Sequence, residues 1–218
     1  MIEFTLWDIV RNLLLALRWT LLLSAIAFIG GGLVAIPVTM MRISDSVGLR
    51  SAAKGYIALL QGTPLLVQLF LAFFGLALLG FNVPPLAAAA LALTLYTSAF
   101  LAEIWRGAIE AVPRGQWEGA KALGLNRFQQ MRLIIIPQAL RVGIAPTAGF
   151  TVQVVKGTAL ASVIGFVELT KAGTMIANAT FDPFRVYGLV ALFYFALCYP
   201  LSLAAKRIEK RVGAGQGH

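Results

Sequence analysis

The sequence predicts an all-α integral membrane protein with five transmembrane helices. Apolar residues make up 59% of the 218 positions and charged residues only 12%, and the mean hydropathy is +0.83. A soluble domain carries about 25% charged residues. Residues 19–41 and 55–102 contain no charge at all, and about 20 apolar residues suffice to cross a bilayer. The excess apolar surface is therefore expected to face lipid.

The first span is expected at about residues 13–41. The segment "LLLSAIA" looks like the end of a signal peptide, but the apolar run continues through "FIGGGLVAIPVTMM". That run is longer than the 7–15 residues of a signal-peptide core. We therefore expect an uncleaved first span.

The 48-residue charge-free block at 55–102 is long enough for two spans. The sequence "GFNVPP" (80–85) contains helix-breaking residues and is the expected turn between spans at 56–79 and 86–106. Further spans are expected at 133–155 and 186–205, so that residues 1–218 form one transmembrane domain. Residues 159–169 are too few to cross, and they are expected to form a re-entrant or interfacial helix on the outer side.

The distribution of Lys and Arg orients the spans. With the N-terminus outside, the inner segments hold 13 Lys or Arg residues and the outer segments hold 5. Cytoplasmic loops carry such an excess. We therefore expect the C-terminus to be cytoplasmic and residues 107–132 to form the largest cytoplasmic loop. Glycines and prolines inside the spans favour close helix packing and bending, and five short spans favour oligomerisation.

Composition also excludes several classes of function. The net charge of +9 is dispersed around apolar runs, which indicates membrane anchoring rather than nucleic-acid binding. A single cysteine, Cys198, forms neither an internal disulfide nor a metal cluster. The sole histidine, His218, is the last residue, which excludes a histidine-based intramembrane enzyme. An ion-coupled secondary amino-acid transporter or channel remains an alternative, although Glu103 is the one intramembrane carboxylate found for it.

The loop at 107–132 is expected to display a short helix. Pro113 and Gly115 end the preceding helix, and Gly124 permits a left-handed turn that ends the new one. Between them, Trp117, Ala120, Leu123 and Gly124 share one helical face. This stripe suits either an interfacial helix lying on lipid or a knob that docks into a groove on a soluble partner.

The loop then resembles a known family. ABC-importer permeases carry a cytoplasmic "EAA" motif: Glu-Ala-Ala, three residues, Gly, nine residues, Ile-x-Leu-Pro. This chain has Glu118-Gly119-Ala120, Gly124 and Ile134-Ile135-Ile136-Pro137 at that spacing. Gly119 and Ile136 depart mildly from the pattern. Residues 61–70, 97–124, 133–141 and 156–169 also resemble the polar amino-acid branch of the histidine/glutamine type.

The resemblance implies the type I ABC-importer permease fold and its partners. Two permease subunits, identical or related, are expected to form the pathway in the bacterial cytoplasmic membrane. Two cytoplasmic ATPase subunits bind ATP and Mg, because this chain has no Walker A pattern and needs no cofactor or metal of its own. An extracytoplasmic binding protein delivers an amino acid, and residues 178–184 are expected to help receive it. ATPase coupling is assigned to Trp117, Glu118, Gly119, Ala120, Leu123, Gly124 and Leu125.

Polar residues inside the spans are candidates for the substrate path, because polar groups in a membrane are costly. The candidates are Thr63, Gln68, Tyr96, Ser98, Glu103, Gln153, Lys156 and Thr158. For Ser and Thr, a hydrogen bond to a carbonyl of the same helix is the competing interpretation. For Glu103, pairing with Arg106 is the competing interpretation. Lys156 either snorkels to the outer boundary or faces the path.

Two departures from the family bear on the substrate. The family commonly has Arg at the position of Gln61, and Lys-Asp-Thr where this chain has Lys156-Gly157-Thr158. Without that aspartate, the site lacks a carboxylate that could pair with a cationic side chain. We therefore expect a neutral polar or acidic amino acid, such as glutamine or glutamate, rather than arginine or histidine. A subunit that holds no substrate, as one half of a heterodimer, is the alternative.

Overall fold

The computed structural model describes residues 5–214, with side chains as far as Arg211. Every regular element in this range is helical. The main helices are α1 (Leu6–Arg42), α2 (Val47–Gly62), α3 (Leu65–Phe70), α4 (Leu76–Leu78), α5 (Pro85–Glu110), α6 (Arg114–Ala122), α7 (Arg127–Gln130), α8 (Ile136–Gly157), α9 (Leu169–Thr180) and α10 (Pro183–Ala214). Two π-helical turns, η1 (Leu71–Gly75) and η2 (Met131–Ile135), and a 3-10 helix, η3 (Thr158–Ile164), join consecutive helices.

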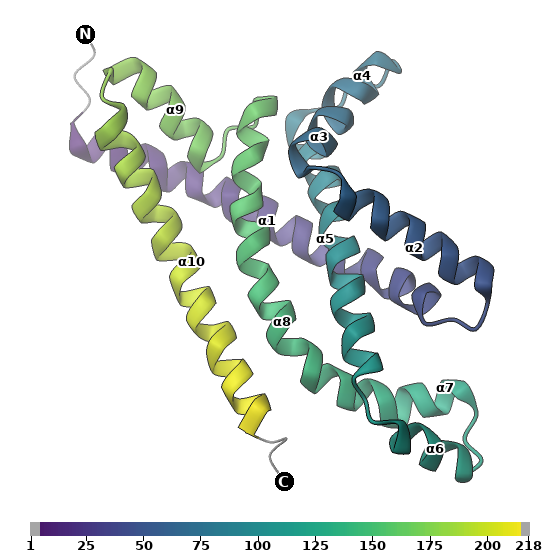
Figure 1. Cartoon of the computed structure of the whole chain (residues 1–218). Coiled ribbons are helices and arrows are strands. Elements are labelled where there is room, and N and C mark those ends of the chain that lie inside the picture. The colour runs from purple at the N-terminus through teal and green to yellow at the C-terminus, as the bar shows by residue number, and fades with distance from the viewer. Residues whose placement is uncertain (1–4, 215–218) are drawn as a thin grey trace.

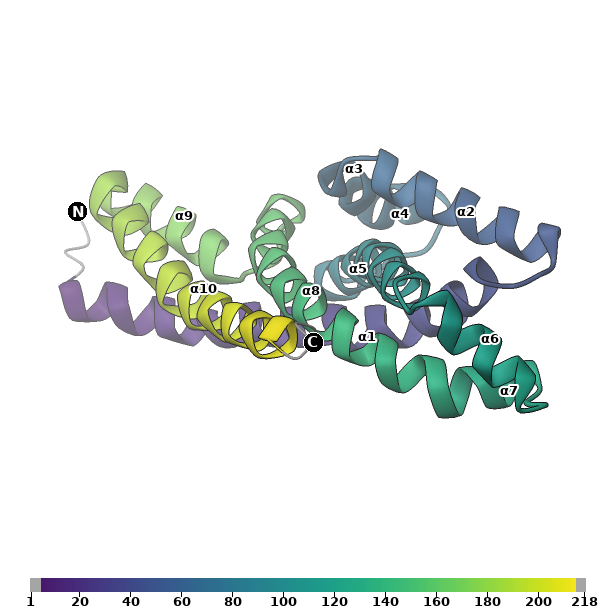
Figure 2. The same ribbon diagram turned by 60° about the horizontal axis from the view of Figure 1, so that its bottom comes forward.

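Helix α5 is the centre of the bundle, and α1, α2 and α8 pack around it. The contact between α1 and α5 is very close because α1 presents glycine there. A Cβ atom on Gly31 would lie 2.6 Å from Cγ2 of Thr97, closer than real side chains approach. Helix α1 continues past α5 and also packs on α9 and α10 (Figure 2). It thereby joins the two halves of the bundle.

Four helical segments in the described part of the chain are long and apolar enough to cross a membrane: Leu6–Arg42, Pro85–Glu110, Arg127–Ile164 and Pro183–Arg211. Each contains one of the predicted spans. The turn predicted at 80–85 is confirmed, since α4 ends at Leu78, Gly80 has φ +87° and α5 begins at Pro85. The start of α1 and the end of α10 lie at opposite ends of the bundle (Figure 1), as an odd number of crossings requires.

The prediction of one continuous helix over 56–79 is wrong. The chain bends by 100° between α2 and α3, so the fifth candidate span is a broken one. Thr63 is extended, with φ −114° and ψ 140°, because a residue before proline is disfavoured in the α conformation. Gln68 stabilises the bend by donating from Nε2 to the carbonyl oxygens of Leu60 (2.8 Å) and Thr63 (3.1 Å).

The outside of the bundle is as apolar as its interior. On α1, large apolar side chains that recur at helical spacing are exposed: Leu14, Leu22, Ile26, Ile29, Leu33, Ile36 and Met40. Such a stripe is expected to face hydrocarbon rather than water. Helix α1 has 37 residues and is about 55 Å long at 1.5 Å per residue. Because a hydrocarbon core is about 30 Å thick, α1 is expected to cross it at a tilt or to extend beyond it.

Candidate functional site

Helix α6 projects from one end of the bundle, beside α7 and on the side where α10 ends (Figure 1). It ends in a Schellman motif. Gly124 has φ +72°, its N–H donates to the carbonyl of Lys121 (2.9 Å), and the N–H of Leu125 donates to the carbonyl of Ala120 (3.2 Å). This pattern satisfies carbonyl groups that a helix end leaves free. The predicted left-handed turn at Gly124 is confirmed.

The predicted docking stripe divides between two faces of α6. Ala120 is 1% exposed, and Trp117 packs against an apolar cluster that includes Ile109, Met131 and Ile135. The prediction that Trp117 and Ala120 lie on the outer surface is therefore wrong. These two side chains anchor α6 to α5 and η2, because this is the apolar face of a half-buried helix.

The outward-facing side of α6 carries the remaining residues of the predicted set. Glu118, Gly119 and Gly124 are exposed, and Leu123 is 76% exposed. Leu125 is half-buried at the start of the next turn. An exposed apolar side chain beside two glycines offers a flat surface that a partner protein can cover.

One hydrogen bond joins α6 to the long helix that follows it, and others order the turn between them. Gln138 of α8 donates from Nε2 to Oε1 of Gln116 on α6 (3.2 Å). In the intervening turn, Gln130 donates from Nε2 to the carbonyl of Leu125 (2.6 Å), and Asn126 and Gln129 form a reciprocal helix cap. A displacement of α6 is therefore expected to move α8 with it.

Glu103 is held by arginines rather than facing an open path. Its Oε1 lies 3.2 Å from Nε of Arg42, and its Oε2 lies 2.7 Å from an Nη atom of Arg106. Arg106 also pairs with Glu110. The interpretation of Glu103 as a structural partner of Arg106 is confirmed, and its candidacy for the substrate path is not supported. Arg42 was missed, since it is distant in sequence.

Five other candidates are scattered and have local roles. Gln68 supports the α2–α3 bend, and Thr63 donates to the carbonyl of Leu59 (2.8 Å). Ser98 donates to the carbonyl of Leu95 (2.7 Å) and meets the Tyr56 hydroxyl. Thr158 is fully buried and donates to the carbonyl of Val155 (2.7 Å). The ring of Tyr96 contacts the ring of Phe100 at a tilt of 41°. The structure thus favours the competing interpretation for the serine and the threonines.

Gln153 and Lys156 do come together, in a groove of about 580 Å³ between α8 and α10. Both side chains are exposed to it. Helix α10 contributes Ser202, Lys206 and Glu209, none of which was predicted to line the path. The other lining residues of α8 are Val142, Ala145, Pro146, Gly149 and Val152. Small residues on α8 leave the groove open, and the polar groups of two helices line it.

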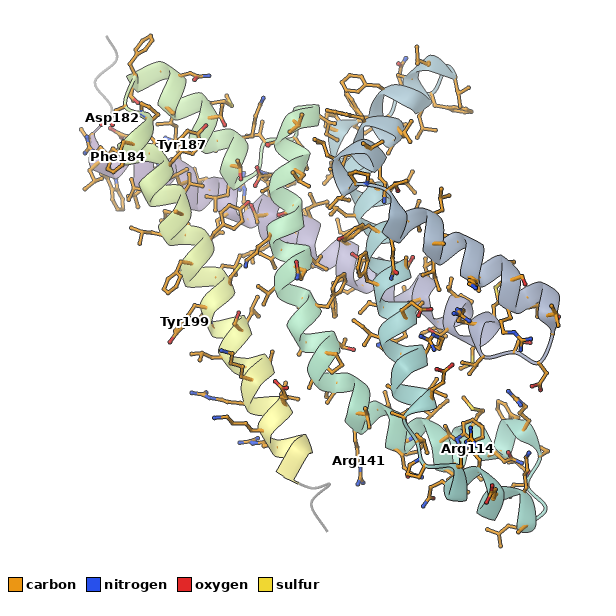
Figure 3. The ribbon with its side chains drawn as sticks, viewed as in Figure 1. Arg114, Arg141, Asp182, Phe184, Tyr187 and Tyr199 are labelled. Atoms are coloured by element: carbon orange, nitrogen blue, oxygen red, sulfur yellow. The ribbon has the colours of Figure 1, made fainter. Side chains whose placement is uncertain are left out.

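Glu168 is a buried carboxylate that was not among the predicted residues, and it is 0% exposed. It caps α9 by accepting from the N–H of Lys171 (2.9 Å), and it accepts from the hydroxyls of Tyr194 (2.8 Å) and Thr20 (3.4 Å). Burial raises its pKa, despite these hydrogen bonds. An acidic residue at the end of an apolar run was the available signal. Figure 3 shows the exposed corner that follows α9, where Asp182 and Phe184 lie.

Known proteins are similar to this chain along almost its whole length. The profile of the family described as binding-protein-dependent transport system inner membrane component matches residues 31–214. The "Probable amino-acid ABC transporter permease protein YckA" of Bacillus subtilis is 34% identical over 97% of this chain and 98% of its own. The glutamine transport system permease protein GlnP of Escherichia coli is 30% identical, with 95% of each chain covered.

Solved structures agree with the sequence relatives. A crystal structure of an amino acid ABC transporter with histidines contains a chain with a TM-score of 0.88 and 33% identity, covering 96% of this chain and 100% of that one. An inward-facing structure of the MetNI methionine ABC transporter has a TM-score of 0.80 at 22% identity, covering 97% and 99%. The second likeness concerns the fold alone.

Proposed function

The chain belongs to the family of binding-protein-dependent transport system inner membrane components, and on this basis we propose how its parts share the work of import. It is the transmembrane permease subunit of an amino-acid ABC importer, and a separate ATPase subunit hydrolyses ATP. An ATPase and a substrate-binding protein are therefore its partners. The finer assignments below are proposals for this chain.

In our proposal, two permease subunits and two ATPase subunits form the complex, and α6 is the element that docks into each ATPase. The observation that carries this is the apolar packing of Trp117 on α6 against Met131 and Ile135, at the base of α8. The exposed edge formed by Glu118, Leu123 and Gly124 meets the ATPase, and the bond from Gln138 to Gln116 (3.2 Å) transmits its movement to α8. ATP-driven closure of the ATPases then switches the pathway between inward-open and outward-open states.

We place the pathway along the groove between α8 and α10, with Gln153 and Lys156 contacting the substrate. The Lys156 ammonium suits the carboxylate of an amino acid. Lys206 and Glu209 line the same groove. The groove therefore carries both positive and negative side chains. With Gly157 in place of the family's Asp, a cationic side chain gains no partner there. The proposed cargo is a neutral polar or acidic amino acid such as glutamine or glutamate.

The orientation is also a proposal. The Lys/Arg bias of 13 against 5 places α6, α7 and the end of α10 on the cytoplasmic side. The N-terminus and the turn at residues 178–184 then lie outside. There Phe181 and Phe184 are 82% and 93% exposed, and we propose that they receive the binding protein. The membrane would be the bacterial cytoplasmic membrane.

Uptake by the reconstituted complex tests the docking role of α6. Permease, ATPase and binding protein are placed in proteoliposomes, and uptake of labelled amino acid is measured with and without ATP. Glu118→Arg reverses an exposed charge on the docking edge and is expected to reduce ATP-driven uptake at least tenfold. Lys54→Gln, an exposed change on a different helix, α2, is the control and is expected to leave uptake unchanged.

Two results would contradict the proposal. Uptake that persists without any ATPase would indicate the ion-coupled transporter or channel instead. Uptake that is equally reduced in Glu118→Arg and Lys54→Gln would remove the special role of α6. Competition with unlabelled amino acids tests the cargo separately, and strong competition by arginine or lysine would rule out the neutral or acidic assignment.

A further inference from the structure

A second groove lies on the bundle surface between α1 and α8, with α5 as its floor. Its volume is about 560 Å³, and its lining is almost wholly apolar. Ile36 and Met40 form one wall, and Leu140 and Ile144 form the other. All four are between 44% and 66% exposed. These side chains face the surrounding hydrocarbon rather than the core of the bundle.

The floor of this groove is low because its residues are small. Ala108 and Gly143 meet there, and a Cβ atom on Gly143 would lie 3.1 Å from the Cβ of Ala108. Trp105 closes the far end, fixed by a bond from its Nε1 to Oγ1 of Thr147 (3.1 Å). The result is an apolar channel with room for part of an alkyl chain.

The groove continues into a cavity of about 660 Å³ beside α7, the polar chamber, whose lining is mostly apolar but includes charged side chains. The two cavities share Met40 and Ile136 as lining residues. The second cavity adds Ser44, Asp45, Arg127 and Arg132 at the end of the bundle where α6 lies. An apolar channel and a polar chamber thus adjoin at the expected membrane boundary.

The polar chamber has an excess of positive charge. Arg127 pairs with Asp45 (3.0 Å) and donates to the carbonyl of Ile43 (2.9 Å). Arg50 reaches the same loop by donating to the carbonyl of Ser44 (3.2 Å). Arg132 is exposed, and it forms neither an ion pair nor a hydrogen bond with any residue in the described range. Two arginines, Arg127 and Arg132, therefore line the chamber with one aspartate, and Arg50 lies on the adjoining loop.

We propose that this composite groove binds one anionic phospholipid. The phosphate lies in the chamber against Arg132, with Arg127 and Arg50 adding to the positive field. One acyl chain lies in the channel between α1 and α8. Basic residues at a cytoplasmic membrane surface attract anionic lipid, and the apolar lining suits an acyl chain. Lipid binding at this site is separate from transport. Only its assignment to the cytoplasmic leaflet rests on the proposed orientation.

Charge favours a lipid over a second copy of the chain. The chamber is basic, and the segments at the same end of the molecule are basic as well, with 13 Lys or Arg residues. Two copies packed chamber to chamber would bring Arg127 and Arg132 of each against the same residues of the other, and these like charges would repel. An amphiphile with one anionic head and an apolar tail complements both cavities.

Native mass spectrometry of the intact importer complex tests the proposal. The complex is purified, delipidated and incubated with an equimolar mixture of phosphatidylglycerol and phosphatidylethanolamine, and the retained lipids are counted. The wild type is expected to retain phosphatidylglycerol preferentially. Arg132→Gln is expected to lower this preference about fivefold, the effect of removing one basic residue from a lipid-facing surface. Arg141→Gln is the matched control, since Arg141 points away from α8 outside both cavities (Figure 3).

A second variant tests the apolar half without changing any charge. Ile144→Trp fills the channel, and phosphatidylglycerol retention is expected to fall while Arg132 is intact. Equal losses in Arg132→Gln and Arg141→Gln would overturn the proposal, since they would indicate diffuse attraction only. Unchanged retention in Ile144→Trp would also overturn it, as would disulfide crosslinking between permease subunits through Leu140→Cys. Because lipid retention is measured without transport, its failure is distinguishable from failure of the proposed function.

Discussion

At the residue scale, Glu168 joins three helices through one side chain. It caps α9, and it accepts hydrogen bonds from the hydroxyl of Thr20 on α1 and from the hydroxyl of Tyr194 on α10. The hydroxyl of Thr20 in turn accepts from the N–H of Leu169 (3.1 Å). A buried polar group of this kind is costly unless it is hydrogen-bonded, and here each neighbour is a donor. Glu168 therefore determines how the second half of the bundle meets the first.

The raised pKa of Glu168 predicts a pH-dependent stability. The folded protein binds the proton of the Glu168 carboxyl more tightly than the unfolded chain does. The contribution of Glu168 to the stability of the fold is therefore greatest below the ordinary pKa of 4.5. It declines as the pH rises from 4.5 through the raised pKa of the folded state. Melting temperatures of the wild type and of Glu168→Gln in detergent, measured between pH 4 and pH 8, give this contribution as their difference.

The glutamine variant stays neutral at every pH, so the change in charge at residue 168 disappears. We expect the wild type to lose melting temperature relative to Glu168→Gln as the pH rises. Other carboxylates contribute equally to both proteins and cancel in the difference. A difference that is constant with pH, or that changes in the opposite direction, would contradict the raised pKa.

At the element scale, the turn between α6 and α7 sets the position of the docking edge. Gly124 has φ +72°, in the left-handed region that costs other residues about 1–2 kcal/mol. Gly119 lies five residues earlier, inside α6. Neither glycine has space-limiting neighbours, since a Cβ at either position would meet no other described atom within 4 Å. The two positions therefore differ in backbone conformation rather than in packing.

This difference predicts opposite outcomes for two small substitutions. Gly124→Ala forces alanine into the left-handed turn and is expected to lower ATP-driven uptake. Gly119→Ala is expected to stabilise α6 by up to about 1 kcal/mol and to leave uptake unchanged or raised. Uptake per permease and the ATPase rate are measured together in proteoliposomes. Equal effects of the two alanines would show that the turn geometry has no special role in coupling.

The bend between α2 and α3 shows the same dependence on local chemistry. The sequence "GTP" at residues 62–64 disfavours a continuous helix. The prediction of one helix over 56–79 followed instead from the apolar length of the segment. The 100° angle itself depends on Gln68, whose amide reaches back to Leu60 and Thr63. That contact joins two helices and is not visible as a pattern in the sequence.

At the scale of the whole molecule, the α8–α10 groove predicts changing access to water during transport. Gln153→Cys is made in a Cys198→Ala background, because Cys198 is the one native cysteine. A charged, membrane-impermeant maleimide is expected to label Gln153→Cys in one nucleotide state and to label it much more slowly in the other. Labelling without nucleotide and with ATP plus vanadate is compared by mass spectrometry.

The control for this experiment is Leu192→Cys. Leu192 is 62% exposed on α10 but does not line the groove, so it is expected to face lipid. A charged reagent should label it slowly in both nucleotide states. Rates at residue 153 that match those at residue 192 would place the pathway elsewhere, and the assignment of Gln153 and Lys156 would then fail.

The sequence by itself determined the membrane class, the four long apolar helices and the family. The length of a segment without charges decides whether it can enter lipid, and this length is a local property of the chain. The fold and the function as a permease subunit followed and are confirmed. The turn at Gly80 and the end of α6 at Gly124 were also readable, because a left-handed backbone conformation favours glycine.

The tertiary structure alone decided which polar residues share a site. Of the eight path candidates, it joined Gln153 and Lys156 in one groove and added Ser202, Lys206 and Glu209 from α10. It turned Trp117 and Ala120 inward, and it gave Glu103 a second arginine from α1. Each of these outcomes depends on which helix packs beside which. Helical periodicity gives the face on which a residue lies, but the packing of distant helices decides what that face meets.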